Sequence, residues 1–589
     1  IGMAGGLRGV SRLAGAPRTA VAPAATELGR VEQALAPEEA GLVTRILSAK
    51  DKFLREFYDK NAPLKELQQA TGIPAHDLAQ VVPGARAAGE ESIQRLVEPV
   101  LRSVGRDVSE LEKYMVIRRA EDIRAINASA KLPGGLSNPG QALSELEGKL
   151  GSQRYGQLEQ AATQLWDLND RLVLQPLLRE GIIGQEAYNA LRAKHPHYID
   201  WHRRLYDVEG PQIGGKPVAN LTSTGIDRMA LEGSELKLNE PLANWAAQII
   251  EVQERVSRNR AGKGMVQALE DVQAQLNQPL VRKATDIKNT VEEGLVSFYE
   301  NGQQITQAVP KVFADVAKGL EAESTGLIGR IALKLAAPLR MGATTYNPAF
   351  VVINPIRDYL TAAFTQGRAV TLSPEYIKGW IAALPKNSDF TDAAQAGTYM
   401  SGIIESFQTT KQMGRAAQHR VLGVPLDSPA DALKLIPRLI EQANIVSERA
   451  TRTAAFLAGE KQGIGPLASA VRGRNVTVDF AKSGNVVKVL NQAIPFMNAG
   501  LQGAANTLKV MRDQPARALL RATPFAAAST LAYAWNQRYE TAKMIPDYEY
   551  TNNWIVMIGE GIEEVDPKTK QQQPYPIYIK IPKGPTGAL

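Results

Sequence analysis

Apolar residues recur every three or four positions along most of this 589-residue chain, which is typical of amphipathic helices. The clearest stripes lie at 155–172, where Gly181 is expected to end the helix, and at 437–461. Further helices are predicted over 185–194 and 240–260. In the 437–461 helix, Glu448 and Arg452 are one turn apart and should form an ion pair. The pattern therefore predicts a mainly α fold, an elongated multi-helix bundle.

Turn and strand signals interrupt the helices at a few places. Asn301-Gly302 lies between strand-like residues and predicts a small hairpin over 292–305. The β-branched and aromatic runs 554–558 and 577–581 predict a small C-terminal β-hairpin. Asn347-Pro348 and Asn354-Pro355 each predict the start of a helix, with Asn as the N-cap and Pro at the first helical position.

The chain is too long for one compact core, so several regions are expected. The Gly- and Pro-rich stretch 131–140 is a clear boundary loop. The predicted regions are a flexible basic arm or linker at 1–30, an N-terminal helical region at 31–140, a middle helical region with loops and a hairpin at 141–330, a helical domain at 331–545 and the C-terminal β-hairpin at 546–589.

Three amides mark one face of a predicted helix after Pro495. Asn498, Gln502 and Asn506 recur every four residues, so they share a face. One interpretation is a solvated polar face, the usual place for such residues. The other is an amide network between packed helices or subunits, which fixes their register. Gly500 and Gly503 would let a neighbouring helix approach closely.

The same neighbourhood is basic. Residues 471–521 contain eight Lys and Arg residues and two Asp residues, which gives this stretch a net charge of +6. The net charge of the whole chain is +7. A cationic patch is the footprint expected of a protein that contacts phosphate; the alternative is a solvated basic face without a nucleic-acid partner. The candidate nucleic-acid contacts are Arg472, Arg474, Lys482, Lys488, Lys509 and Arg512.

Candidate chemistry is sparse. The absence of cysteine excludes disulfides, thiolate metal sites and thiol catalysis. No phosphate-binding loop, nucleophile elbow or HExxH motif occurs. His195, His197 and His202 with Asp200 could bind zinc, or could lie solvated on an extended loop. Carboxylates are plentiful, but no pair stands in an apolar setting that would separate their pKa values. We therefore predict no enzyme activity, catalytic residue, metal or cofactor.

Membrane signals are equally limited. No run of eighteen apolar residues occurs, and the nearest candidate, 524–535, is too short to span a bilayer. Any membrane contact is therefore expected to be interfacial or to be made by an assembly.

Four segments together carry a resemblance to a known family. They are Asn347-Pro348-Ala349-Phe350 with Asn354 and Arg357-Asp358, then Ser447-Glu448-Arg449 to Gly463, then Thr477 to Phe480 with Pro495 to Ala499 and Gln502-Gly503, and last Ile577 to Gly584. Their order and spacing resemble the large polyvalent protein-associated domains of bacteriophages and mobile elements. The resemblance covers 330–589, so 331–545 would be a polyvalent-protein-like helical domain. The run 180–198 is similar more weakly.

The resemblance implies an internal virion protein, or ejection protein, of a short-tailed bacteriophage. Such a protein is a structural component of an oligomeric channel that conducts the phage genome across the host cell envelope. Implied partners are further copies of the chain, other phage ejection proteins, the portal or tail, non-specifically bound double-stranded phage DNA and the host inner membrane. The implied location is the virion interior, then the host periplasm and cell envelope after ejection.

A second possibility belongs to another class. The chain would then be a helical scaffold region of a larger virion RNA polymerase or mobile-element polyprotein, whose enzyme domain lies elsewhere.

Overall fold

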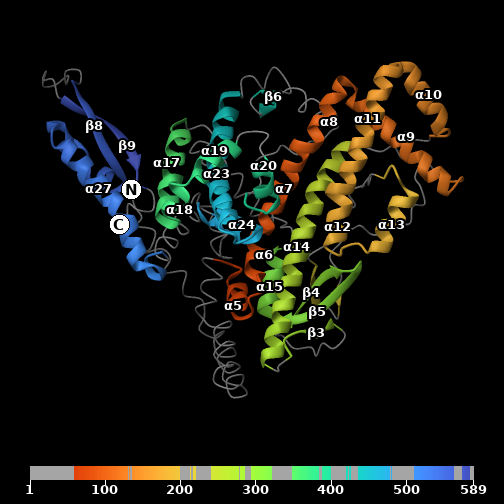
Figure 1. The fold of residues 1–589 in the computed structure, drawn as a ribbon, viewed down its shortest axis with the longest axis horizontal. Coiled ribbons are helices and arrows are strands. Elements are labelled where there is room, and N and C mark those ends of the chain that lie inside the picture. Colours follow the sequence, from red (N-terminus) through yellow and green to blue (C-terminus); the bar gives the residue numbers. More distant parts are fainter. Residues whose placement is uncertain are drawn as a thin grey trace.

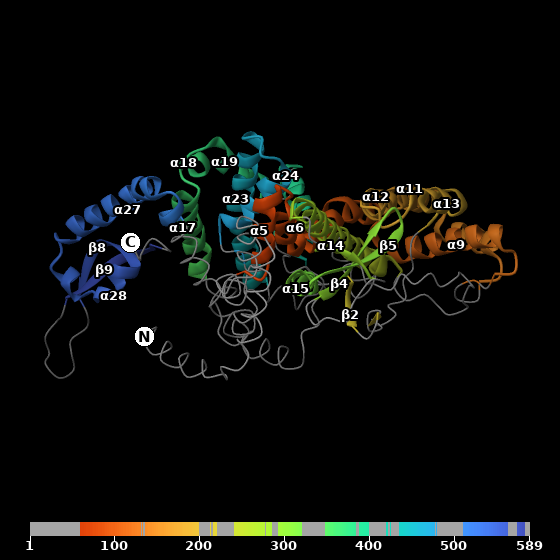
Figure 2. The ribbon, with the colours of Figure 1, turned by 90° about the horizontal axis from the view of Figure 1, so that it is seen from below.

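The computed structural model describes residues 59–130, 132, 136–198, 212–213, 216–220, 241–276, 279–284, 293–320, 348–383, 388–399, 420–421, 424–425, 435–477, 479, 510–562 and 574–583. Figure 1 shows an elongated, mainly helical molecule with small sheets, which confirms the predicted fold class. Seen from below in Figure 2, the helices form a long row rather than a ball.

The first part of the chain is a run of short and medium helices. They are α5 (Ala62–Thr71), α6 (Ala75–Val81), α7 (Ala85–Ser92), α8 (Glu98–Ser103), α9 (Val108–Ile126), α10 (Pro139–Leu150), α11 (Ser152–Asn169), α12 (Gln175–Arg179) and α13 (Gln185–Lys194). The Asn138 side chain accepts a hydrogen bond from the Gln141 amide and caps α10, so the predicted boundary loop ends in a new helix. Gly181 has a φ of 75° just beyond α12, as predicted for a helix stop.

Helix α14 (Pro241–Leu276) has 36 residues and runs through the middle of this half. Its first half, with Trp245 and Ile249, belongs to a core shared with α9, α11 and α12. Its second half, with Met265 and Leu269, belongs to another core shared with α5, α6 and α15 (Lys311–Leu320). One helix therefore supplies a wall to two separate cores. The sequence predicted this helix only to 260.

A small sheet packs beside the second of these cores. Its order is β1 (Gln212–Ile213), β2 (Lys216–Asn220), β4 (Glu293–Glu300), β5 (Gln303–Pro310) and β3 (Arg282–Lys283). Strands β4 and β5 pair antiparallel around Asn301 and Gly302, whose φ angles are 51° and 78°, so the predicted hairpin is confirmed. Gly302 donates a 2.9 Å hydrogen bond to the Gly181 carbonyl, which docks the hairpin tip onto the turn after α12.

The second half contains α17 (Pro348–Thr365), α18 (Arg368–Thr371), α19 (Pro374–Ala382), α20 (Ser388–Gln395), α23 (Leu435–Lys461) and α24 (Pro466–Asn475), with a minimal pair of strands, β6 (Arg420–Val421) and β7 (Val424–Pro425). The Glu448–Arg452 ion pair on α23 is confirmed at 2.7 Å. The prediction that Asn354-Pro355 starts a helix is wrong, because Pro355 lies inside α17. Proline removes one intrahelical hydrogen bond, and packing of α17 along α23 outweighs that loss.

Small residues bring α19 and α23 into close contact. A Cβ atom on Gly379 would lie 2.6 Å from the Ala450 carbonyl oxygen, so only glycine fits at this crossing. The Glu375 carboxylate of α19 also forms an ion pair with the Lys461 ammonium at the end of α23, at 2.8 Å. The two helices are thus fixed at both a backbone contact and a charged contact.

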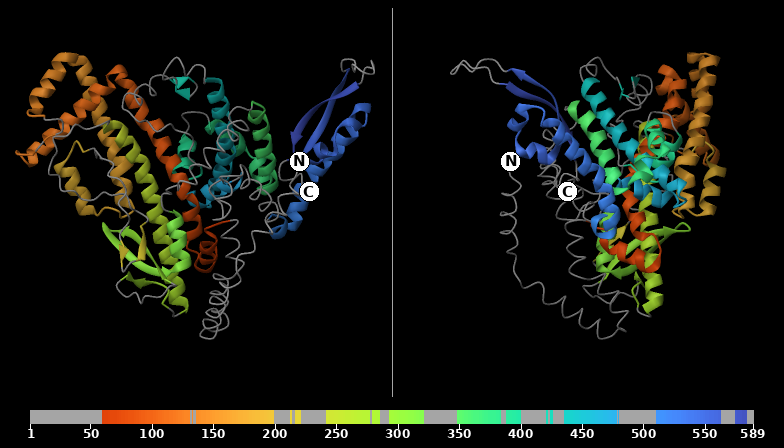
Figure 3. Two further views of the ribbon diagram at one scale, coloured as in Figure 1. Left: turned by 180° about the vertical axis from the view of Figure 1, so that it is seen from behind. Right: turned by 60° about the vertical axis from the view of Figure 1, so that its left-hand side comes forward.

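The end module, which we define as residues 515–583, lies at one end of the molecule (Figures 1 and 3). It contains α27 (Pro515–Asn536), α28 (Asp547–Asn552), β8 (Asn553–Ile562) and β9 (Pro574–Pro582). Strands β8 and β9 form the predicted C-terminal hairpin, with a bulge between Met557 and Gly559. The module meets the rest of the protein where α17 contacts α27 and β9.

The Asn536 side chain occupies the free edge of β8. Its Nδ2 donates to the Ile555 carbonyl at 2.7 Å, and its Oδ1 accepts from the Met557 amide at 2.9 Å. The Trp535 indole donates to the Met557 carbonyl at 2.8 Å. Strand β9 contains three prolines, so its own edge offers few amide donors. Both edges of the hairpin are therefore protected.

Candidate nucleic-acid and assembly surfaces

Most of the predicted contact residues fall outside the described part of the chain. These are the amide stripe and the three lysines: Asn498, Gln502, Asn506, Lys482, Lys488 and Lys509. The structure does describe Arg472, Arg474 and Arg512, together with Arg517 and Arg521 of the same basic stretch.

Arg474 is a structural residue, so its prediction as a nucleic-acid contact is wrong for this fold. Its side chain is fully buried at the end of α24. The guanidinium donates two hydrogen bonds to the Asp479 carboxylate, at 2.9 and 2.8 Å, and a third to the Gly397 carbonyl at 3.2 Å. A guanidinium used in this way cannot reach a phosphate without opening the core.

Arg472 and Arg521 hold the turn that follows α17. Arg521 donates to the carbonyls of Phe364 and Thr365, at 3.0 and 2.9 Å, and so satisfies the last turn of the helix. Arg472 donates to the Gln366 side chain at 3.2 Å. Burial lowers the pKa of both guanidinium groups. Of the described cations of the basic stretch, Arg472, Arg474 and Arg521 are therefore used in contacts within the protein.

Arg512 and Arg517 are the exposed cations of the stretch within the described residues. The Arg512 side chain is 71% exposed and pairs with the neighbouring Asp513 at 2.8 Å. That bond raises the pKa of the guanidinium. Exposed pairs of this kind exchange readily with solvent and with other anions. These two arginines lie just before and within the first turn of α27, so they form a small cationic surface at one end of that helix.

Several carboxylates are buried, so the prediction that no pair lies in an apolar setting is wrong. Glu90, on the Ala- and Gly-rich helix α7, is 3% exposed. Arg86 donates to one of its oxygens at 3.2 Å, and the other oxygen accepts no hydrogen bond in the described structure. Burial raises the pKa of Glu90 to about 7, and the Glu254 carboxylate of α14 adds to that rise. Burial also raises the pKa of Glu91.

Asp358 is a second buried acid, on α17. Its pKa is raised to about 7, mainly by burial and further by Glu448 of α23, while Arg357 and Arg452 act in the opposite direction. Arg452 itself is 1% exposed and donates to the Thr477 hydroxyl at 3.1 Å. Each of these two acids thus lies near one arginine of its own helix and one arginine of α23. The arrangement links α7 and α17 to α23 by charge.

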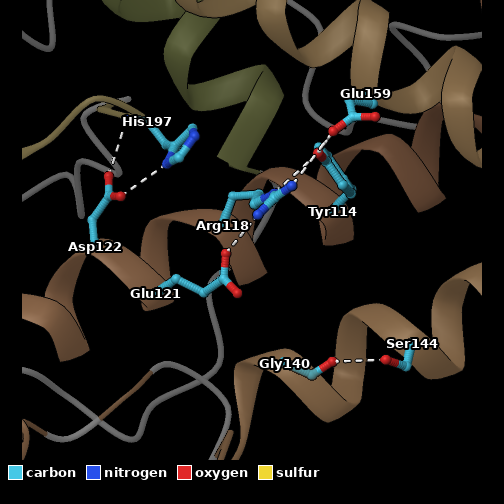
Figure 4. A network of polar contacts seen from close by, with 8 residues as sticks. All are labelled: Tyr114, Arg118, Glu121, Asp122, Gly140, Ser144, Glu159 and His197. Atoms are coloured by element: carbon cyan, nitrogen blue, oxygen red, sulfur yellow. Dashed lines mark hydrogen bonds and ion pairs between the residues drawn. The ribbon is translucent and has the colours of Figure 1, made fainter.

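The histidine cluster lies between α9 and the end of α13 (Figure 4). The Asp122 carboxylate accepts hydrogen bonds from the His197 ring at 2.8 Å and from the His197 backbone amide at 3.0 Å. The His197 ring lies 4.4 Å from that of Trp166. Arg119 contacts the His195 ring at 2.5 Å and, together with burial, lowers its pKa. A cation beside His195 would repel a metal ion.

In the described part of the chain, no three potential metal ligands come together; His202 and Asp200 lie outside it. The alternative of solvated histidines is wrong for the two described ones, because His195 contacts Arg119 and His197 bonds to Asp122. These contacts fasten the end of α13 to α9. Figure 4 shows a related network in which Arg118 of α9 reaches Tyr114 at 3.0 Å, Glu121 at 3.0 Å and Glu159 of α11 at 3.5 Å. The Ser144 hydroxyl in the same view donates to the Gly140 carbonyl at 3.2 Å, a contact within α10.

Large apolar side chains are exposed at many positions of the second half, among them the β8–β9 hairpin and two helical regions. On α27 these are Leu519, Leu520, Leu531, Tyr533 and Trp535, each between 41% and 73% exposed. Around α19 they are Leu372, Ile377 and Ile381, each between 54% and 68% exposed. Ile377 and Ile381 are one turn apart, so they share a face of α19. Contiguous apolar surface of this kind marks sites where a soluble chain meets a partner.

A pocket of about 340 Å³ opens between α27 and β8. Its polar groups already bond within the protein, since the Trp554 indole donates to the Ser529 hydroxyl at 2.7 Å and the Lys583 ammonium donates to the Tyr550 carbonyl at 2.6 Å. We therefore interpret the pocket as a gap between packed elements of the end module.

Comparison with protein-family models, curated proteins and solved structures finds no match. The described helices include none that is long and apolar enough to cross a membrane.

Proposed function

We propose that this chain is a structural internal virion protein of a short-tailed bacteriophage, a subunit of a homo-oligomeric channel that conducts the phage genome across the host cell envelope. The proposal starts from the resemblance of residues 330–589 to polyvalent-protein domains. It is supported by the elongated helical fold and by the apolar surface that the single chain leaves exposed.

The observation that carries the proposal is the exposed apolar face of α19. Ile377 and Ile381 are 66% and 54% exposed, and Leu372 just before the helix is 68% exposed. The opposite face of α19 is held tightly against α23 through Gly379 and Glu375. A rigid helix with one apolar face open suits a contact between subunits. Asn498, Gln502 and Asn506 remain proposed contacts between helices or subunits.

The charges are suited to light contact with DNA. Arg474 is used inside the fold, whereas Arg512 and Arg517 are exposed and bond to the nearby Asp513 and Gln514 side chains, which an incoming phosphate could replace. Lys482, Lys488 and Lys509 remain proposed phosphate contacts. A few exposed cations give weak binding that depends on salt and ignores sequence, which lets DNA slide.

Electron microscopy of the purified protein, with and without detergent, tests the assembly. We expect closed oligomers for the wild type and their loss in the double variant Ile377→Glu/Ile381→Glu, because two unpaired charges would then be buried at each contact. Ile126→Glu is the control, since Ile126 is a lone exposed apolar residue at the end of α9, 52% exposed. A compact monomer under all conditions would refute the proposal.

The same experiment separates the alternative, a scaffold region of a larger polymerase or polyprotein. A scaffold of that kind is expected to stay monomeric by itself, and its reading frame should extend far enough to encode an enzyme domain.

Gel-shift titrations with unrelated DNA duplexes at rising salt test the proposed contact with DNA. Equal affinities that fall steeply with salt are expected, and a strong preference for one sequence would contradict the proposed role.

A further inference from the structure

The outer face of α27 is apolar over most of the helix. The inner face packs on the hairpin, where Phe525 stacks on Trp554 with ring centres 5.9 Å apart. The outer face exposes Leu519, Leu520 and Leu531 by 71–73% of their surface. No charged residue lies between Arg521 and Arg538. The uncharged residues 522–536 of α27 extend about 22 Å.

Cations mark both ends of this face. Arg512 and Arg517 precede it, and Arg538 follows it, with its guanidinium 4.5 Å above the Trp535 ring. The helix itself carries no carboxylate. If a second copy of α27 covered the face, parallel pairing would bring like ends of the helix together and set Arg517 against Arg517. Antiparallel pairing would set Arg517 near Arg538. The charge pattern therefore fits an anionic partner better than it fits another α27.

The aromatic residues at the end of α27 have the arrangement expected at a membrane interface. Tyr533 is 61% exposed, and Trp535 is 41% exposed while its indole N–H is satisfied by the Met557 carbonyl. Aromatic rings with a satisfied polar group and a flanking cation are typical of the headgroup level of a bilayer.

We propose that the outer face of α27 is a membrane-binding surface that lies in the interface of a bilayer containing anionic phospholipids. The leucines would enter the acyl boundary, and Arg517 and Arg538 would meet lipid phosphates at the two ends. This inference rests on the proposed function, because it names the partner of the end module in the envelope. In this proposal α27 lies along the surface of the bilayer.

The end module is built to present this face without refolding. Asn536 and Trp535 fasten the end of α27 to β8, and Trp554 bonds to Ser529 in its middle. In Figures 1 and 2, the module lies at one end of the long molecule, with α27 along its outer side.

Vesicle flotation of the full chain tests the proposal. The probes are vesicles of phosphatidylcholine alone and of phosphatidylcholine mixed with phosphatidylglycerol. We expect strong flotation with the mixed vesicles only. The double variant Leu519→Glu/Leu531→Glu should lower partitioning at least about tenfold, because two charges would enter the interface. Arg517→Gln should weaken binding about fivefold on anionic vesicles, an effect that salt removes.

The matched control is Ile126→Glu/Ile464→Glu, which makes the same change at two exposed isoleucines that lie outside α19 and α27. It should bind vesicles like the wild type at protein concentrations below assembly. Circular dichroism melts verify that every variant is folded, which is expected because the replaced side chains are exposed. Wild-type protein that ignores anionic vesicles, or equal flotation of Leu519→Glu/Leu531→Glu, would overturn the inference.

The outcomes also separate this inference from the proposed function. Closed oligomers that do not bind vesicles would refute the membrane surface alone. Monomers that bind anionic vesicles through α27 would refute the channel and keep the membrane surface. If Leu519→Glu/Leu531→Glu abolished self-association and left vesicle binding unchanged, the face would belong to a second copy, and the inference would fall.

Discussion

The buried pair between Arg474 and Asp479 allows a sharp test of how the basic stretch is used. Both side chains are almost inaccessible, at 0% and 4% exposure, and two parallel hydrogen bonds join them. Arg474 also donates to the Gly397 carbonyl, 77 residues earlier in the chain. We expect Arg474→Met to be strongly destabilising, because it leaves the Asp479 charge buried without its main counter-ion.

The magnitude follows from the burial. Removing one partner of a buried ion pair costs about 3–5 kcal/mol, whereas an exposed pair is worth at most about 1 kcal/mol. Replacing both partners by apolar side chains is often nearly neutral, so Arg474→Met/Asp479→Leu should recover most of the loss. The coupling free energy between the two sites should then exceed about 2 kcal/mol. Arg512→Met is the control, since the Arg512–Asp513 pair is exposed, and its effect should stay within about 1 kcal/mol.

Urea denaturation followed by circular dichroism measures the free energies of unfolding, and DNA titration of the same variants measures any contact with phosphate. The structural role predicts that Asp479→Leu rescues Arg474→Met. If Arg474→Met unfolds like the wild type and loses more DNA affinity than Arg512→Met, the assignment of Arg474 to the core is refuted.

Three further predictions concern other buried contacts. Glu90→Gln and Asp358→Asn should each raise the free energy of unfolding at pH 8 by up to about 3 kcal/mol, because burial raises both pKa values to about 7. The folded state binds these protons more tightly than the unfolded state, so the stability of the wild type falls as pH rises towards 7. The stability gained by each variant should therefore shrink towards pH 4. A gain that stays constant across pH in denaturation titrations would contradict this. Gly379→Ala should lower the free energy of unfolding by about 1–3 kcal/mol in thermal melts, because its Cβ would lie 2.6 Å from the α23 backbone. The control is Gly148→Ala on α10, where no atom lies within 4 Å of the new Cβ, and it should raise the free energy of unfolding by about 1 kcal/mol. Asn536→Leu should lose about 2–3 kcal/mol and speed hydrogen exchange at the amide of β8 that it caps, and unchanged exchange there would show that the edge is held by other contacts.

The features that the sequence predicted correctly depend on near neighbours in the chain. Helix α13 begins and ends at the predicted residues because Gly184 and the His195-Pro196 step bound it locally. Asn301-Gly302 forms its turn because these two residues accept positive φ angles. The Glu448–Arg452 pair needs only the geometry of one helix.

The features that the sequence did not predict depend on distant neighbours. Helix α14 continues past 260 although Gly264 suggests a break, because that glycine admits the Leu78 side chain, which would lie 2.6 Å from a Cβ there. Glu90 is buried only when α14 packs on α7. Arg474 looked like a surface cation because Gly397, whose carbonyl it binds, lies far away in the chain. The small residues around Glu90 were the one local hint of close packing.

Helix α14 gives the first half of the molecule a particular mechanical character. Because Trp245 belongs to one core and Leu269 to another, unwinding this helix would remove a wall from both cores. At about 54 Å, this rod is also too long to turn sideways in a narrow conduit. If the protein leaves a capsid through such a passage, it must travel end-on, or else unwind the rod and dissolve both cores in a single step.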